Sequence, residues 1–243
     1  AYDPDSDTLF AVDRESGLIH RFNLRGEEIG RFDHGLAGRQ AAGLPPVAFD
    51  PSRWLNIADP AFDSANPDTW NYAAPERRIF GIGIRAGRLY YAVAAGLQVW
   101  SSAITPNGLA DPVLELALPP GSGPSEISKI TFDELGRMFL AERPASTGAF
   151  DFHELAIAGT GRVLRYQIVD RTPDGRRVWQ PLPDEYATGF PPRLQNGNGG
   201  VAIGYSYRNS GELDRGTCGG FLFSAVAIGY SYRNSGELDR GTC

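Results

Sequence analysis

Residues 127–142 read ISKITFDELGRMFLAE, and this stretch gives the clearest indication of the fold. A run rich in β-branched and aromatic residues (127–133) ends in an Asp, and a second apolar run (138–142) follows Gly136 and Arg137. An Asp in this position caps a tight turn, and a Gly in the turn adopts a positive φ without steric cost. The stretch therefore predicts two antiparallel strands joined by a short turn, with the second strand buried.

The same alternation of short strands and turn residues recurs along the chain. Gly and Asp separate the runs, which is the usual signal for hairpins. No segment keeps a helical period of apolar residues, so long helices are not expected. Meanders that repeat every ~40–50 residues are typical of propeller blades. The further runs typical of strands are 8–13, 18–24, 27–33, 46–50, 55–59, 79–84, 88–94, 97–104, 162–169, 177–182, 200–207, 212–215 and 219–224.

The pattern predicts an all-β fold, with a single β-propeller of about five or six blades spanning residues 1–225. Closing the ring removes exposed sheet edges, which favours a propeller for a chain of many short strands. A β-sandwich is the alternative, because it is also built from many short strands. Longer segments interrupt the meanders at 60–78, 105–126 and 143–161, and long loops in compact domains often carry the functional site. The glycines of 81–87 (GIGIRAG) lie within strands and indicate close packing of neighbouring blades.

An exact duplication marks the C-terminal part of the sequence. Residues 201–218 (VAIGYSYRNSGELDRGTC) recur without change at 226–243. The repeats of natural propellers diverge, so we interpret 226–243 as an engineered, artefactual or edge-pairing segment rather than a further blade. Both cysteines, Cys218 and Cys243, belong to the duplicated segments. A disulfide between them is one hypothesis, and a thiol whose partner lies outside this chain is the other.

Composition argues against some classes of partner. The net charge of −6 and the isoelectric point near 5.1 argue against nucleic acid, which needs a basic surface. No stretch approaches the ~18 apolar residues of a membrane-spanning helix. Residues 1–4 (AYDP) read as the tail of a strand, which indicates a processed or trimmed start. Such a start fits an exported protein, either periplasmic or extracellular.

The stretch 127–142 resembles the blade signature of the gluconolactonase and senescence-marker propellers and of the NHL-repeat propellers, and 1–13 and 47–59 are looser matches. The resemblance implies a propeller. Its lactonase members further imply one divalent cation, such as Ca²⁺, held at the central mouth by oxygen ligands. On the matching positions those ligands would be Glu126, Asn198 and Asp59. The remaining Asp of the family pattern has no counterpart in the second half of the chain.

Three functions are compatible with these features. The leading hypothesis is a non-enzymatic binding or scaffold protein that engages a protein or small molecule through the loops on one face, because the catalytic set is incomplete. Trp70, Asn71 and Tyr72, in the first of the long segments, are its candidate partner-binding residues. The first alternative is a metal-dependent lactonase-like hydrolase, in which the cation polarises a lactone carbonyl and activates water. The second alternative is a structural subunit of an envelope assembly.

Overall fold

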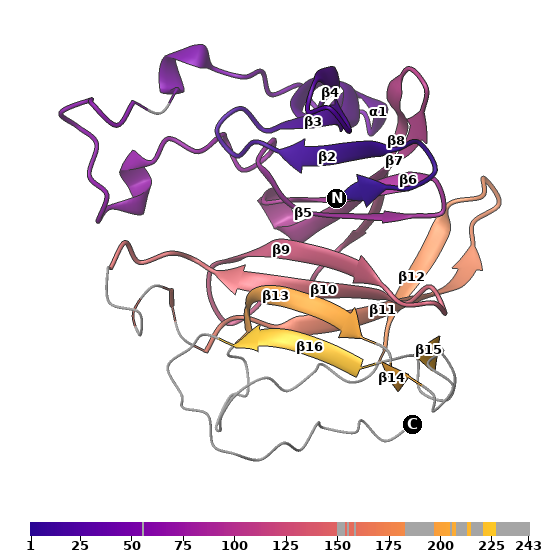
Figure 1. Cartoon of the computed structure of the whole chain (residues 1–243). Coiled ribbons are helices and arrows are strands. Elements are labelled where there is room, and N and C mark those ends of the chain that lie inside the picture. Colours follow the sequence, from indigo (N-terminus) through magenta and orange to yellow (C-terminus); the bar gives the residue numbers. More distant parts are fainter. Residues whose placement is uncertain are drawn as a thin grey trace.

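The computed structural model describes residues 1–54, 56–149, 154, 156–157, 159–182, 197–204, 206–207, 213–214 and 221–226. Three four-stranded antiparallel sheets form the body of this mostly β protein (Figure 1). The first sheet contains β1 (Tyr2–Asp3), β2 (Thr8–Val12), β3 (Leu18–Asn23) and β4 (Glu28–Asp33). The second contains β5 (Ile79–Arg85), β6 (Arg88–Val93), β7 (Gln98–Thr105) and β8 (Gly108–Ala117). The third contains β9 (Ser125–Phe132), β10 (Met138–Pro144), β11 (Val163–Arg171) and β12 (Arg177–Pro181).

Strands that are adjacent in each of these sheets are also consecutive in the sequence. Two further strand pairs follow, β13 (Gly197–Gly204) with β16 (Phe221–Val226), and β14 (Ser206–Tyr207) with β15 (Leu213–Asp214). The helical elements are short: α1 (Arg39–Ala41), a π-helical turn (His34–Gly38), and 3₁₀ turns at Pro51–Arg53, Pro67–Thr69 and Ala95–Leu97. The prediction of a β-rich chain of short antiparallel meanders, without long helices in its described part, is confirmed.

The predicted strands at 46–50 and 55–59 are wrong for the residues that are described there. This segment forms turns that are stabilised by its own side chains. Asp50 and Asn56 each accept, through Oδ1, a hydrogen bond of 3.0 Å from the backbone N–H two residues further on. Asp and Asn side chains that bond nearby backbone in this way compete with a strand ladder. The looser match to the blade signature in this region is therefore a series of turns.

Strand β8 lies within 105–126, a segment that the residue pattern predicts to be a loop. Asp111 and Pro112 interrupt its apolar run, and its ladder with β7 contains two register shifts. A Pro is tolerated there because β8 is the outermost strand of its sheet and needs no further hydrogen-bonding partner. This strand gives the second sheet four strands where the pattern indicates three.

The predicted turn between β9 and β10 forms as expected. Asp133 is only 2% exposed, and its Oδ1 accepts a hydrogen bond of 2.8 Å from the Arg137 backbone N–H. Gly136 has a φ of +84°, in the region that favours glycine. Every residue of β10 except Arg143 is buried. The Asp cap, the Gly turn and the buried second strand are thus confirmed.

The second and third sheets meet through their first strands, β5 and β9, which lie side by side (Figure 1). A Cβ atom on Gly81 would lie 2.9 Å from the carbonyl oxygen of Ile127, and one on Gly83 would lie 2.6 Å from that of Ile130. Residue numbers rise together along the two strands, so β5 and β9 run parallel. Only glycine permits an approach this close. The prediction that the glycines of 81–87 mark close packing between sheets is confirmed for these two positions.

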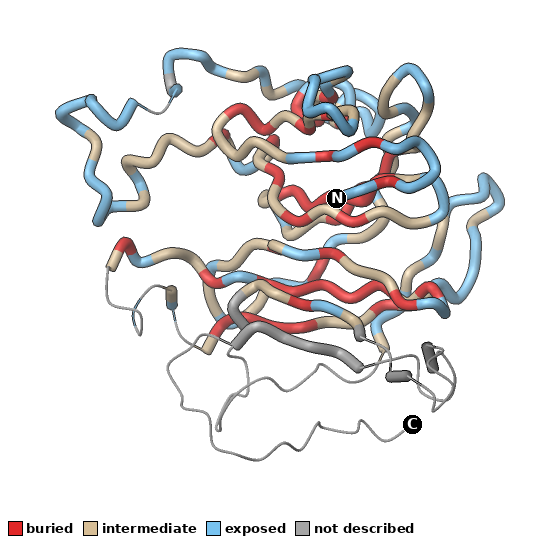
Figure 2. The backbone as a smooth tube through the Cα atoms, in the orientation of Figure 1, coloured by how far each residue is buried: buried red, intermediate tan, exposed pale blue. Residues whose placement is uncertain are grey.

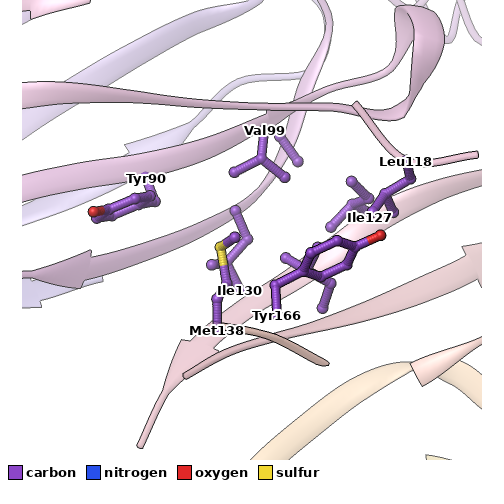
Figure 3. Close-up of a cluster of buried hydrophobic side chains, with 9 residues drawn as sticks. Tyr90, Val99, Leu118, Ile127, Ile130, Met138 and Tyr166 are labelled. Carbon is purple, nitrogen blue, oxygen red and sulfur yellow. The ribbon is translucent and has the colours of Figure 1, made fainter. Parts of the chain in front are cut away.

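The apolar core lies in layers between the sheets. Figure 2 marks the buried residues along the backbone. Successive residues of β6 alternate between two layers, because side chains of a strand point to opposite faces. The second sheet is therefore covered on both faces. The layer toward the first sheet contains Phe10, Ile19, Phe32, Ile79, Leu89, Tyr91, Val93 and Trp100. The layer toward the third sheet (Figure 3) contains Tyr90, Ala92, Val99, Leu118, Ile127, Ile130, Met138, Leu140 and Tyr166.

A buried polar cluster joins the outer strands of the second and third sheets. Glu115 of β8 accepts hydrogen bonds from Arg177 Nε at 3.0 Å and from Trp179 Nε1 at 2.8 Å, both on β12. It also accepts one from the Ser101 hydroxyl. Burial alone would raise the pKa of Glu115, but these three donors outweigh burial and hold that pKa below its ordinary value. The carboxylate is therefore fully used in holding the two sheets together.

The second copy of the duplicated segment, 226–243, lies outside the described residues except for Val226. Val226, the first residue of the second copy, ends β16 and pairs with Gly197 of β13. The rest of β16 comes from the residues between the two copies. Cys218 and Cys243 lie outside the described residues, so their disulfide stays a prediction. The same holds for the single domain at 1–225 and for the interpretation of 226–243.

We expect Gly83→Ala to lower the free energy of unfolding by about 1–3 kcal/mol, the usual cost of overpacking. The added methyl group would meet the Ile130 carbonyl oxygen. Gly30→Ala is the matched control, because Gly30 also lies in a strand and nothing lies within 4 Å of its added Cβ. Urea unfolding followed by circular dichroism measures both variants. Equal free energies of unfolding for Gly83→Ala and Gly30→Ala would contradict the close packing of β5 on β9.

A histidine is enclosed between the first and second sheets. His34 is fully buried, its Nδ1 lies 3.1 Å from the Tyr91 hydroxyl, and its ring meets Trp100 edge to face. Burial, together with the charges of Arg39 and Arg77, lowers the pKa of His34 to about 3. The folded protein therefore keeps this imidazole neutral at pH values where the unfolded chain protonates it.

This histidine makes stability depend on pH. Its folded pKa lies below its ordinary value of 6.5, so protons favour the unfolded state and stability falls as the pH falls from 6.5 toward 3. Relative to His34→Gln, we expect the protein to lose about 2 kcal/mol of unfolding free energy between pH 7.5 and pH 5. Urea unfolding at the two pH values provides the comparison. If the unfolding free energies of the protein and of His34→Gln change equally between the two pH values, the imidazole is not held neutral.

Candidate functional site

Described residues from all three long excursions predicted from the sequence, 60–78, 105–126 and 143–161, line a pocket at one end of the sheets. We call it the arginine–aromatic pocket. Its volume is about 560 Å³, enough for a small organic ligand. The residues that line it are Arg14, Ser64, Pro67, Asp68, Trp70, Tyr72, Arg78, Phe80, Pro124, Ser125, Glu126, Arg143, Pro144, Ala145, Ser146, Gly148, Ala149 and Ala156.

The parallel course of β5 and β9 brings the charged residues of this pocket together. Arg78 directly precedes β5, Phe80 is the second residue of β5, and Glu126 is the second residue of β9. Because the two strands run in the same direction, their starting residues fall at the same end of the sheets. Arg143, near the end of the antiparallel strand β10, is the direct cross-strand partner of Glu126. Three strands from two sheets thus supply one side of the pocket.

Arg14 reaches the same place from the turn after β2. Its carbonyl oxygen accepts a hydrogen bond of 2.9 Å from the Ala73 backbone N–H, which fixes this turn to the segment before β5. Its guanidinium carbon lies 4.4 Å from the ring centre of Tyr72 and 4.1 Å from that of Phe80. A guanidinium at this distance from aromatic rings is attracted by their π electrons. The first sheet therefore contributes a stacked cation to the pocket.

Glu126 lies among these cations. Its carboxylate accepts a hydrogen bond from Arg14 Nη2, and its Oε1 lies 2.7 Å from Arg78 Nε. The three side chains are only about one-fifth exposed, so water and salt screen them less than a surface pair. Arg78 Nε lies close to the carboxylate but outside hydrogen-bonding geometry. The Nε atoms of Arg14 and Arg78 are both buried and have no hydrogen-bond acceptor among the described atoms.

The described lining of the pocket carries a surplus of positive charge. It contains Arg14, Arg78 and Arg143, against the carboxylates of Glu126 and Asp68. Burial is the largest influence on the pKa of Arg14 and lowers it, while the ion pair with Glu126 acts in the opposite direction. A guanidinium stays charged at neutral pH even so. An excess of guanidinium groups at a cavity favours the binding of an anion.

Two of the predicted partner-binding residues, Trp70 and Tyr72, lie in the wall of the pocket. Their rings meet edge to face with 6.1 Å between centres, and Trp70 Nε1 donates a hydrogen bond of 3.2 Å to the Asp63 carbonyl oxygen. Asn71, between them, lines a separate cavity of about 130 Å³. Partner binding through these residues stays a prediction, which the position of the two rings supports.

Two of the predicted metal ligands lie in different places. Glu126 lines the arginine–aromatic pocket, whereas Asp59 lines the small cavity beside Asn71. The third, Asn198, belongs to β13, and the carbonyl oxygen of its neighbour Gly199 accepts a hydrogen bond of 2.7 Å from the Ser128 hydroxyl of β9. The side chain of Asn198 lies outside what is described. Among the described residues, no three His, Cys, Asp or Glu side chains group closely enough to hold a metal ion.

The residue pattern does not predict Arg14, Arg78, Phe80 or Arg143 as site residues. Arg14 and Glu126 are 112 positions apart in the sequence, and their pairing depends on how the sheets pack. One signal was available. Each of the three arginines directly follows or precedes a predicted strand, and in stacked sheets the strand ends gather at a common edge.

In comparison with known proteins, the chain matches no family model and no curated protein. The resemblance to lactonase and NHL-repeat propellers therefore stays a hypothesis, carried by residues 127–142. Where the chain is described, no helix has the length and apolar character needed to cross a membrane. The assignment of a function must therefore depend on the geometry and charge of the pocket.

Proposed function

We propose that this chain is a non-enzymatic binding protein that holds a small organic molecule in the arginine–aromatic pocket. The observation that carries the proposal is the pocket itself, with a volume of about 560 Å³. The rings of Trp70, Tyr72 and Phe80 supply apolar and π surface, and guanidinium groups from three separate parts of the chain supply charge. Apolar walls with a few convergent polar groups are typical of small-molecule sites.

We also propose that the sheets are blades of a β-propeller. Propeller blades are four-stranded antiparallel meanders arranged around an axis, and the three meanders here have that composition. The side-by-side course of β5, β9 and β13 supports the proposal, because these strands then correspond to the inner strands of successive blades. A β-sandwich has two sheets with one inner face each. The second sheet, covered on both faces, fits a sandwich less well.

A screen of small organic acids, amines and neutral ring compounds tests the binding function. We expect some of them to raise the melting temperature. Titration calorimetry should then show affinity roughly tenfold lower in Trp70→Ala and in Tyr72→Ala, because one aromatic contact is removed. Trp54→Ala is the control, since Trp54 is 56% exposed and is not among the lining residues. Binding that both pocket variants retain in full, or no binding at all, would contradict the proposal.

A metal-dependent lactonase-like hydrolase is the second candidate. The observation in its favour is that Glu126 starts β9, and that β13, which contains Asn198, lies beside the same strand. A cation there would polarise a lactone carbonyl and activate water. Glu126 would first have to exchange Arg14 and Arg78 for the cation. Because the cation would have to displace two ion pairs of Glu126, we place the hydrolase second to the binding protein.

Metal analysis separates the two functions. The binding protein predicts no stoichiometric divalent cation and a melting temperature that a chelator leaves unchanged. The hydrolase predicts about one Ca²⁺ or similar ion per chain, lost on chelation and in Glu126→Gln. Asp59→Asn is the matched control, because Asp59 lies in the separate small cavity. Mass spectrometry of the metal content and thermal unfolding give the two readouts.

A further inference from the structure

The geometry points to a ligand class for the arginine–aromatic pocket: a small monocarboxylate with a ring or similar apolar body, whose carboxylate binds Arg143. This inference rests on the proposed function, since it specifies what the same pocket holds. Three observations carry it, namely that Arg143 has no carboxylate partner among the described residues, the charge balance of the pocket's described lining, and the apolar character of its walls.

Arg143 has no carboxylate partner in the part of the chain that the structure describes. It lies directly opposite Glu126 in the β9–β10 ladder, a position in which opposite charges normally pair. The oxygens of Glu126 instead contact Arg14 and Arg78. Glu126, the cross-strand partner of Arg143, is therefore already paired with two other cations. Arg14 comes from the turn after β2, and Arg78 comes from the segment that precedes β5.

The neighbouring carboxylate is also occupied. Glu142 is fully buried and accepts hydrogen bonds from Arg162 Nε at 2.7 Å and from Arg162 Nη2 at 2.5 Å. Its side chain points to the other face of the strand, because successive residues alternate. Arg143 is exposed, lines the pocket, and has its guanidinium carbon 5.9 Å from the ring centre of Phe80. Its planar fork of donors fits a ligand carboxylate.

The charge balance sets the charge of the ligand. Among the residues that the structure describes, three guanidinium groups and two carboxylates, those of Glu126 and Asp68, line the pocket, which leaves one positive charge without a counter-charge in this set. A monoanion neutralises the site. A dianion such as a phosphate monoester would leave a net negative charge in a partly dehydrated cavity, which is unfavourable.

The walls set the nature of the remaining ligand atoms. Trp70 and Tyr72 present ring surface, and Pro67, Pro144 and Ala145 add aliphatic surface. The cavity, at about 560 Å³, is far larger than a carboxylate group alone requires. A ring-bearing or otherwise apolar body that stacks on the aromatic wall would fill this space and exclude water from the ion pair.

Benzoate, phenylacetate and cyclohexanecarboxylate are the probes, and benzamide and inorganic phosphate are the comparison compounds in titration calorimetry. We expect benzamide, a neutral analogue of benzoate, to bind roughly tenfold more weakly or worse. Arg143→Gln should weaken benzoate by a similar factor and leave benzamide unchanged, while Arg143→Lys should give an intermediate loss. Arg25→Gln is the matched control, because Arg25 is exposed in a turn and is not a lining residue.

The outcomes distinguish the ligand class from the proposed function. Equal affinity for benzoate and benzamide, unaffected by Arg143→Gln, would overturn the monocarboxylate while small-molecule binding stands. Tighter binding of phosphate than of every carboxylate would also overturn it. If only neutral ring compounds bind, and Trp70→Ala abolishes that binding, the monocarboxylate is again overturned while small-molecule binding stands. If neither carboxylates nor neutral compounds bind, the proposed function fails together with the inference.

Discussion

The close approach of the β5 and β9 backbones determines how the second and third sheets pack and where the pocket forms. Gly81 and Gly83 leave room for carbonyl oxygens of β9 at distances that a side chain would not permit. With the two strands parallel and side by side, Arg78 and Glu126 fall at the same end of the sheets. Gly199 repeats the arrangement for β13, since a Cβ there would collide with the side chain of β9 residue Ser128. The sheets are therefore stacked in series.

The segment that leads into β5 connects this stacking to the site. Arg77 is 1% exposed, and it donates hydrogen bonds of 2.7 Å to the Ser16 carbonyl oxygen and of 3.1 Å to Asp33 Oδ2. A buried guanidinium that is satisfied in this way ties the first sheet to the second. Arg77 lies in the turn that precedes β5, and the next residue, Arg78, contacts Glu126 instead. The same two residues thus fix the packing of the sheets and shape the pocket.

The local features of the fold could be predicted because each depends on residues only a few positions apart. Asp133 and Gly136 make the β9–β10 turn within five residues, and their types are sufficient to predict it. Local prediction failed where another local signal competed, as with the Asp and Asn turns before β5 and with Pro112 in β8. Trp70 and Tyr72 were found because they lie in a long loop, whereas Phe80 lies in β5 and was missed. The Arg14–Glu126 pair spans 112 positions and depends on sheet packing, so it had no local signal.

The contrast between the charged clusters of the molecule indicates what the pocket is for. The buried carboxylates that hold the sheets are saturated: Glu115 accepts from three side chains, and Glu142 binds one guanidinium through both oxygens. In the pocket, Arg143 has no carboxylate partner among the described residues, because Glu126 is already paired with Arg14 and Arg78. A guanidinium in this position can bind a ligand carboxylate through two donors. Its place at a cavity with aromatic walls, rather than the number of arginines, is what favours an anionic ligand.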